Sequence, residues 1–302
     1  MQNISLQSKV IFLLIFLALI WGSSFILMKK GLMAFTPLEV GAIRITVAAA
    51  CFLPIAIRSF SKLSRRDGMM MALLGLIGNG IPAFLFPLAE TKINSATAGM
   101  LNSLTPMFAL LLGVLLFGVA FSWKKTAGIV IGFLGALLLM LSSEREIINQ
   151  VEEPLRITLI YSSFIVLGTL LYGLNVNLMK RYLNHVPSLQ ISTFSLFWIG
   201  IPYAIYLLLF SQVPEKIQTH PEGMSSLMFV AILGVGSTAI STVLFYRLVQ
   251  WTDAVVSSSV TYLMPIVALA WGFYLEENIN AWQIGGMFVI LSGVYLVNKK
   301  EG

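Results

Sequence analysis

The sequence contains little charge, a single cysteine and two histidines. Asp, Glu, Lys and Arg make up 11% of the 302 residues and apolar residues 58%, whereas about 25% of an average soluble domain is charged. Charge this sparse cannot form a basic face for nucleic acid, and an apolar content this high excludes a disordered chain. One cysteine, Cys51, excludes a disulfide framework within the chain. A soluble fold cannot hide this much apolar surface, so the composition predicts a membrane protein.

Ten apolar runs are long enough to be transmembrane helices, because a helix needs roughly 20 apolar residues to cross a hydrocarbon core of about 30 Å. Only the second run contains charged residues, Glu39 and Arg44. The first run lacks a convincing cleavage site, so we expect it to remain in the mature protein. The expected spans are 10–28, 37–57, 68–89, 93–118, 126–142, 158–179, 188–212, 224–246, 254–275 and 281–297. The sequence therefore predicts an all-α polytopic membrane protein.

The loops between the runs indicate an orientation. With the N-terminus in the cytoplasm, the inner segments hold twelve Lys and Arg residues and the outer segments hold six. Positive residues concentrate on the cytoplasmic side of membrane proteins. We therefore expect both termini in the cytoplasm and a plasma-membrane location.

The chain contains an internal repeat. When it is shifted by 159 residues, positions 72–123 align without a gap on 231–282, and thirteen of these 52 positions are identical. Roughly four identities would be expected by chance in so apolar a sequence. Near the start of each half, a spacing of 151 aligns Gly22 with Gly173 and Lys29 with Lys180. We expect one repeat over 9–143, a second over 157–298, and an outer linker over 144–156.

Each expected repeat holds five helices, so the second copy enters the membrane from the opposite side. The two copies are then related by an axis in the membrane plane. This inverted-repeat arrangement is typical of secondary transporters, which bind substrate near the midplane between the halves.

Several motifs resemble those of the EamA family. Residues 21–25 (WGSSF) resemble its opening motif, and Arg44 resembles the arginine of its second helix. Leu104-Thr105-Pro106 and Leu263-Met264-Pro265 resemble its proline motif, whereas Phe117-Gly118 replaces the glutamate of the first repeat. In the second repeat, Glu276-Glu277 resembles that glutamate. The resemblance covers essentially the whole chain. It implies the drug/metabolite transporter superfamily, with ten helices, two EamA repeats, an inner-membrane location and export of small metabolites.

Polar side chains within the apolar runs are the candidate substrate-binding residues, since a polar group in a membrane needs a cavity or another helix to face. They fall in equivalent helices of the two repeats. For any one Ser or Thr, a bond between helices is the simpler interpretation, and for the Asn residues a cavity is favoured. The predicted set is Trp21, Ser24, Asn79, Asn102, Tyr172, Asn175, Thr238 and Tyr262.

Four further residues are assigned gating or structural roles. Arg44 is the only basic residue in a span, and anchoring at the outer interface is favoured over contact with substrate. Glu90 ends the third span, where a plain helix-end charge is favoured over a proton carrier. Pro106 and Pro265 are repeat mates that remove a backbone donor, so they are expected to shape the cavity or its gate.

We therefore expect a secondary transporter that exports small polar metabolites by alternating access, with amino acids or related compounds the leading class. A passive channel or facilitator, or an exporter of drugs or other metabolites, remains an alternative. An enzyme is not expected, because both histidines lie in loops and no span contains Asp. No cofactor, metal or nucleic acid is expected. The expected partners are a small-molecule substrate and the lipid bilayer, and a monomer is compatible with the sequence.

Overall fold

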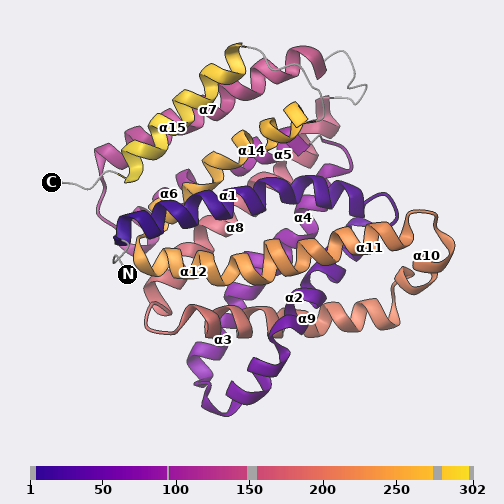
Figure 1. The fold of residues 1–302 in the computed structure, drawn as a ribbon. Coiled ribbons are helices and arrows are strands. Elements are labelled where there is room, and N and C mark those ends of the chain that lie inside the picture. The colour runs from indigo at the N-terminus through magenta and orange to yellow at the C-terminus, as the bar shows by residue number, and fades with distance from the viewer. Residues whose placement is uncertain (1–4, 94, 148–154, 275–280, 299–302) are drawn as a thin grey trace.

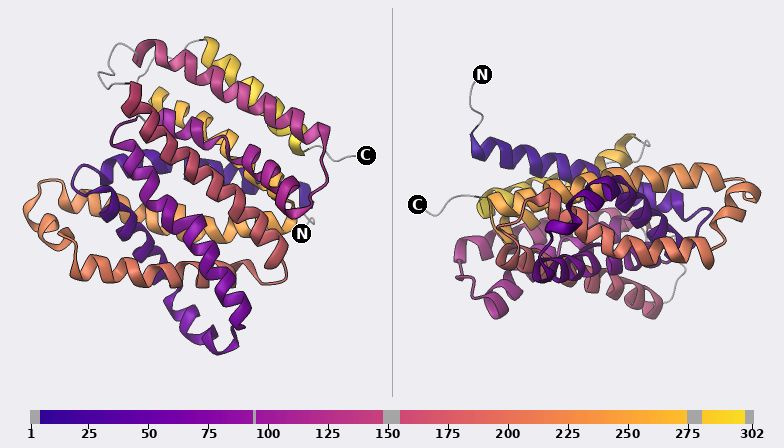
Figure 2. Two further views of the ribbon diagram at one scale, coloured as in Figure 1. Left: turned by 180° about the vertical axis from the view of Figure 1, so that it is seen from behind. Right: turned by 90° about the horizontal axis from the view of Figure 1, so that it is seen from below.

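The fold is a bundle of helices, seen from three sides in Figures 1 and 2. A computed structural model describes residues 5–93, 95–147, 155–274 and 281–298, and this part of the chain contains no strand. Six helical stretches in it are long and apolar enough to cross a membrane: Leu6–Gly31, Pro37–Ser59, Arg65–Glu90, Arg156–Tyr182, Ser188–Leu209 and Gly223–Trp251. The expected helical class is therefore confirmed. Glu276 and Glu277 lie outside the described residues.

The elements follow in this order. In the first half they are α1 (Leu6–Gly31), α2 (Pro37–Ser59), η1 (Phe60–Lys62), α3 (Arg65–Gly75), η2 (Leu76–Gly80), α4 (Ile81–Glu90), α5 (Ser95–Asn102), α6 (Thr105–Phe117) and α7 (Trp123–Ile147). In the second half they are α8 (Leu155–Tyr182), α9 (Ser188–Leu209), α10 (Val213–Thr219), α11 (Gly223–Ile232), η3 (Leu233–Ile240), α12 (Ser241–Trp251), α13 (Ala254–Ser258), α14 (Val260–Tyr274) and α15 (Ala281–Asn298).

Local sequence fixes where α2 begins. The Thr36 hydroxyl accepts from the backbone N–H of Glu39, and the Glu39 carboxylate accepts from the backbone N–H of Thr36 at 2.8 Å. This reciprocal capping box satisfies two backbone donors, and Pro37 in the first turn needs no acceptor. The Glu39 carboxylate also accepts from Lys216 at 2.6 Å and from the backbone of Gln212 at 3.2 Å. The start of α2 is therefore joined to the start of α10.

Two of the expected spans contain a segment with wider helical turns. The segments η2 and η3 have π-helical hydrogen bonding, and each lies between two α-helices. They occupy overlapping positions when the chain is shifted by 159 residues. A π-helical turn carries one extra residue, which turns the side chains after it to a different face, and such turns are frequent at functional sites.

Two other expected spans are divided into a short and a longer helix. The run 93–118 becomes α5 and α6, and the run 254–275 becomes α13 and α14. Pro106 lies in the first turn of α6, where a missing N–H costs nothing, so it begins a helix instead of kinking a continuous one. Its mate Pro265 lies inside α14. The prediction of one continuous helix over each of these two runs was therefore wrong.

Helices α7 and α15, one from each half, lie side by side at the upper edge of Figure 1 and are again paired in Figure 2. Their glycines, Gly128 and Gly135 among them, let the two backbones touch. A methyl group at Gly128 would lie 2.9 Å from the Gly293 carbonyl oxygen, and one at Gly135 would lie 3.0 Å from that of Gly286. The contacting residue in α15 has a lower number when the residue in α7 has a higher one, so the two helices are antiparallel.

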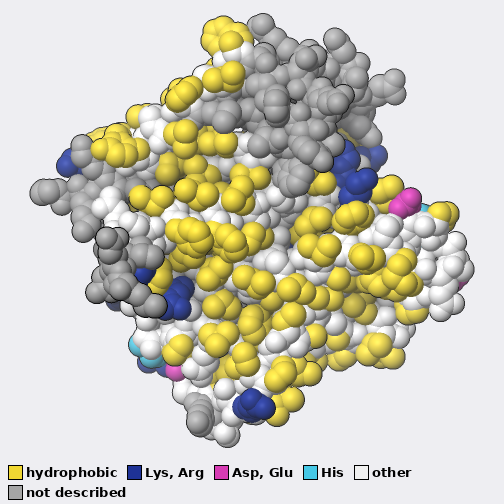
Figure 3. Space-filling view, in the orientation of Figure 1, with side chains coloured by type: hydrophobic (Ala, Val, Ile, Leu, Met, Phe, Trp, Pro, Cys, Tyr) yellow, Lys and Arg dark blue, Asp and Glu magenta, His cyan; other side chains and the backbone are white. Residues whose placement is uncertain are grey.

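At one end of the bundle, the Lys180 side chain of α8 caps the C-terminal end of α12. Its ammonium donates to the carbonyl oxygens of Val249, Gln250 and Thr252 at 3.0, 3.1 and 2.7 Å. These carbonyls have no partner within their own helix, and a positive charge there also opposes the helix dipole. On the face shown in Figure 3, hydrophobic side chains are spread across the helices and the charged groups lie toward the margins. This is the surface that a bilayer requires.

Candidate substrate cavity

A cavity lies inside the bundle and is lined by residues of both halves. The space open to the centres of water molecules is about 100 Å³, where one water needs roughly 10–15 Å³. The cavity therefore holds several waters or one small organic solute. Its polar lining residues include Ser24, Arg44, Asn79, Asn102, Thr105, Tyr172, Asn175, Ser237, Thr242, Tyr246, Ser258 and Thr261. Among the described residues, Arg44 is the one charged residue in the lining.

The two halves contribute matching positions to this lining. In seven cases, a lining residue of the first half and its repeat mate in the second half both line the cavity. The pairs are Trp21 and Tyr172, Ser24 and Asn175, Phe25 and Val176, Gly78 and Ser237, Phe86 and Phe245, Asn102 and Thr261, and Thr105 and Met264. The cavity is thus built at the junction of the two repeats, where inverted-repeat transporters bind their substrates.

Six of the eight predicted substrate-binding residues line this one cavity: Trp21, Ser24, Asn79, Asn102, Tyr172 and Asn175. Trp21 joins the halves, because its indole N–H donates to the Ser237 carbonyl at 2.9 Å and its ring meets Phe245 edge-on at 5.1 Å. The Ser24 hydroxyl donates at 2.6 Å to the Trp21 carbonyl within the same helix. Ser24 is therefore satisfied locally, as a membrane serine often is.

The amides of Asn79 and Asn102 have different surroundings. Asn102 is buried; its side-chain N–H₂ lies 3.3 Å from the Met264 sulfur, and its backbone carbonyl accepts from Thr105 at 2.8 Å. Asn79, in η2, is partly exposed and makes no side-chain hydrogen bond within the described part of the chain. An amide at this depth needs a water or a solute as its partner.

Asn175 is held in place by both halves. Its side-chain N–H₂ donates to the Leu74 carbonyl at 2.8 Å, and its amide oxygen accepts from the Tyr246 hydroxyl at 3.4 Å. The same amide lies against Gly78, where a methyl group would overlap it. Glycine at position 78 therefore lets α8 approach η2 closely enough for the bond to Leu74. Tyr172 packs its ring against Phe86, with centroids 5.7 Å apart.

Thr238 and Tyr262, the other two predicted residues, lie outside the lining. Thr238 is fully buried, and its hydroxyl accepts from Arg44 Nε at 2.6 Å. Tyr262 is also fully buried; its hydroxyl donates to the Ile129 carbonyl at 3.0 Å and its ring packs on Gly132. Tyr262 therefore makes a bond between helices, as does Thr238, for which such a bond was the simpler interpretation; Thr238 reaches the cavity only through Arg44.

The predicted gating or structural residues lie in three settings. Arg44 lines the cavity. Glu90, at the end of α4, is 8% exposed, and neither carboxylate oxygen has a hydrogen-bond partner among the described residues, so it is not a solvated helix-end charge. Pro106 and Pro265 are not among the lining residues, but each neighbours one, Thr105 and Met264 respectively. The roles of all four remain predictions.

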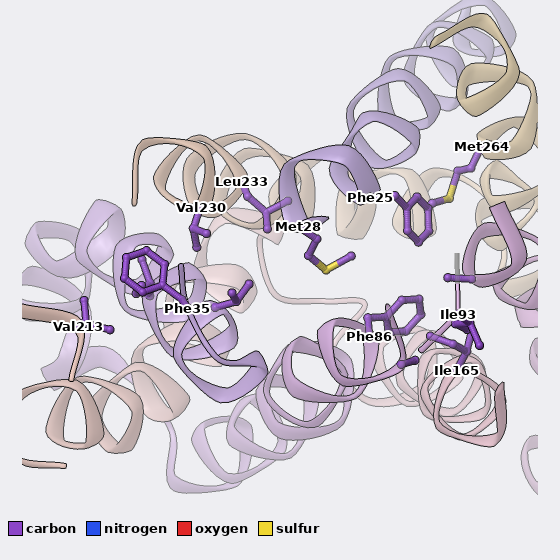
Figure 4. Packing of buried hydrophobic residues seen from close by; sticks show 14 residues of the cluster. Phe25, Met28, Phe35, Phe86, Ile93, Ile165, Val213, Val230, Leu233 and Met264 are labelled. Atoms are coloured by element: carbon purple, nitrogen blue, oxygen red, sulfur yellow. The ribbon is translucent and has the colours of Figure 1, made fainter. Parts of the chain in front are cut away.

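Sequence reasoning missed the apolar part of the lining, which includes Phe25, Met28, Phe86 and Met264. Figure 4 shows these four among the buried side chains of one cluster, with Phe25 close to Met264. A phenylalanine in an apolar helix gives no sign of facing a cavity rather than the core. The repeat does supply a signal, because Phe86 and Phe245 are identical mates within the aligned segment.

An all-helical membrane protein with a cavity between two repeats has the architecture of a solute transporter. Comparison with known proteins agrees: a model of the EamA-like transporter family matches residues 8–141 and again residues 159–299. The chain therefore belongs to the EamA-like transporter family, as its motifs indicated. Within the described residues, no three His, Cys, Asp or Glu side chains form a group that could hold a metal ion.

Relatives match along nearly the whole chain. An uncharacterized transporter of Archaeoglobus fulgidus is 22% identical over 93% of this chain and 95% of its own. A probable terminal-alkyne amino-acid exporter of Streptantibioticus cattleyicolor is 24% identical over 97% and 94%. An S-adenosylmethionine/S-adenosylhomocysteine transporter of Chlamydia muridarum is 24% identical over 90% and 86%. A crystal structure shares the fold, with a TM-score of 0.72 and 16% identity over 96% of each chain.

Proposed function

We propose that this protein is a secondary transporter that exports small polar metabolites, with amino acids or close relatives as the substrate class, by alternating access. The observation that carries the proposal is the cavity whose lining pairs seven positions of one repeat with seven mates in the other. Two similar halves around one site can exchange conformations, so that one gate closes as the other opens. A passive pore does not require this matching.

The proposed topology has ten spans in two inverted repeats, over 9–143 and 157–298, with 144–156 as the outer linker. The contacts of α7 and α15 support the inversion. One deletion beyond the ungapped segment, the repeat alignment pairs Gly128 with Gly286 and Gly135 with Gly293. Exchanging the halves turns the contact of Gly128 with Gly293 into the contact of Gly286 with Gly135, and both are present. Such reciprocity is the mark of a two-fold axis between antiparallel elements.

The proposed location is the bacterial inner membrane, with both termini in the cytoplasm. The twelve-to-six distribution of Lys and Arg supports this orientation. In a Cys51→Ala background, single cysteines at Lys62 and Glu152 should react differently with an impermeant thiol reagent on intact cells. Labelling at 152 alone supports the orientation, and labelling at 62 alone would reverse it.

The substrate class rests on the chemistry of the cavity and on resemblance. Neutral amides, hydroxyls and aromatic rings bind a zwitterion through hydrogen bonds without burying uncompensated charge. A multiply charged nucleotide sugar would need more than one arginine. The amino-acid exporter among the relatives supports the same class.

Counterflow in proteoliposomes tests the proposal. Purified protein should exchange neutral amino acids saturably, and Asn79→Ala or Asn102→Ala should weaken the exchange because both amides line the cavity. Saturable exchange of a nucleotide sugar with none of any amino acid would reject the substrate class and leave the carrier intact. Flux without counterflow would indicate a channel.

A further inference from the structure

We propose that Arg44 makes the cavity a carboxylate-binding site, so that the transporter selects solutes carrying one carboxylate and rejects those whose only charge is positive. The inference deepens the proposed function and rests on solutes passing through this cavity. It assigns Arg44 to substrate recognition instead of the anchoring role that its position in the sequence favoured. The reasons lie in how its guanidinium is held and in what surrounds it.

A hydrogen bond at the Nε edge of the Arg44 guanidinium holds its orientation. Arg44 Nε donates to the Thr238 hydroxyl at 2.6 Å, and that hydroxyl lies 3.5 Å from the Leu233 carbonyl, which it can donate to. Thr238 is fully buried in η3, so it cannot move aside without repacking the core. A threonine hydroxyl at this position thus fixes the arginine from behind. Thr238 is a positioning residue that acts on the solute only through Arg44.

The opposite edge of the guanidinium is free for a ligand. Arginine carries five N–H donors, of which Nε supplies one. The four on Nη1 and Nη2 have no hydrogen-bond acceptor among the described residues, although Arg44 lines the cavity. Leaving these donors empty at this depth is unfavourable, and a carboxylate is the group whose two oxygens match the fork of a guanidinium.

Charged neighbours do not occupy that edge. Glu90 interacts electrostatically with Arg44 and with Lys29 of α1, but both of its oxygens lack a hydrogen-bond partner among the described residues and it is outside the lining. Tyr172 lines the cavity together with Arg44, and a phenol is neutral at physiological pH. Glu90 therefore does not compete for the donors of Arg44.

The remainder of the lining is suited to the other end of the same solute. Asn79 is the repeat mate of Thr238, yet its amide makes no hydrogen bond to any described residue and borders the cavity. Its oxygen can accept from an ammonium, and the rings of Trp21 and Tyr172 offer π faces to a cation. Among the described residues no carboxylate lines the cavity, so a solute whose only charge is positive would meet Arg44 without an acidic group of the lining to bind it. A zwitterion or a monocarboxylate fits, and a cationic amine does not.

Counterflow with matched solutes tests this inference. L-leucine carries both charges, 4-methylpentanoate keeps only the carboxylate, and L-leucinamide keeps only the ammonium. Wild-type protein should exchange the first two at least about tenfold faster than the amide, a preference of ~1.4 kcal/mol. Arg44→Gln should abolish this preference, and Arg44→Lys should retain part of it, because an ammonium keeps the charge but not the fork.

Thr238→Val separates positioning from structure. Valine has nearly the same shape but no hydroxyl, so Arg44 should lose its orientation while the core remains packed. We expect a higher leucine concentration for half-maximal exchange, with an unchanged maximal rate and an unchanged elution volume on size exclusion. Equal exchange of leucine and leucinamide by the wild type, or an intact preference in folded Arg44→Gln, would overturn the inference while the transporter assignment stands. Absence of exchange for every solute would overturn both.

Discussion

Replacing Glu39 with Gln and Lys216 with Met, singly and together, measures the ion pair that joins α2 to α10. The carboxylate of Glu39 is almost fully buried, and the Lys216 side chain is 22% exposed, with 2.6 Å between Nζ and Oε2. Besides Lys216, the carboxylate accepts from the backbone of Thr36 and of Gln212. Its loss therefore removes a cap as well as a charge.

The burial of the two side chains sets a lower and an upper limit on the free energy that the ion pair contributes. Exposed ion pairs contribute about 0.2–1 kcal/mol, whereas removing one partner of a buried pair costs about 3–5 kcal/mol. With one partner buried and the other mostly so, we expect Glu39→Gln to lower the free energy of unfolding by about 3 kcal/mol. Lys216→Met leaves the carboxylate with its other donors and should cost about 2 kcal/mol. The double variant should resemble Glu39→Gln, which gives a coupling of about 2 kcal/mol.

Reversible unfolding by SDS in mixed micelles, followed by circular dichroism, gives the four free energies of the cycle. The control is the more exposed pair of Lys125 and Asp253, also 2.6 Å apart, with side chains 27% and 41% exposed. In that cycle Asp253→Asn keeps an oxygen to cap α13, and we expect a coupling below about 1 kcal/mol that salt weakens. A Glu39–Lys216 coupling that is below the control, or that disappears in high salt, would refute the reasoning from burial.

Three further substitutions test the packing of the helices, each against a matched control. Gly293→Ala should destabilise the protein by about 1–3 kcal/mol, because its methyl group would meet the backbone of α7 at 2.6–2.7 Å. Gly285→Ala on the same helix places its methyl group in open space and should stabilise the protein by up to about 1 kcal/mol. The free energies of unfolding in SDS show whether the two changes have these opposite signs. Lys180→Met should cost about 2 kcal/mol by releasing three carbonyls of α12, and Lys180→Arg should cost less; equal costs would contradict the cap. Gly78→Ala should slow counterflow about tenfold by displacing Asn175, while Gly236→Ala, with open space around it, should leave counterflow unchanged.

The sequence was sufficient for the helical class and for part of the polar lining. Hydropathy locates helices well, because an apolar run of this length has no alternative that satisfies its backbone in a membrane. Asn79 and Asn175 could be found because an amide is costly in hydrocarbon. The capping box formed by Thr36 and Glu39 can also be identified in the sequence as the start of a helix.

The remaining features depend on tertiary geometry. Nothing local marks Leu233–Ile240 as a π-helical segment, although the extra residue of such a turn changes the face of the helix on which Thr238 lies, next to Arg44 instead of in the cavity lining. Tyr262 carries the same hydroxyl as Tyr172, but only the position of α7 shows that its hydroxyl is already bonded to Ile129. Aromatic residues of the lining cannot be separated from those of the core by composition, since both lie in apolar runs.

The contact of α7 with α15 also limits how the molecule can move. These helices belong to different repeats, yet their backbones touch at Gly128, Gly135 and Gly293. Interlocked backbones resist sliding, since a shift along the axis would drive side chains into the space that only glycine leaves open. Any rotation of one repeat against the other must therefore take place about the contact of α7 with α15. Displacement then grows with distance from this pair of helices, so α3, at the opposite edge of the bundle in Figure 1, would move further than α9 or the start of α2.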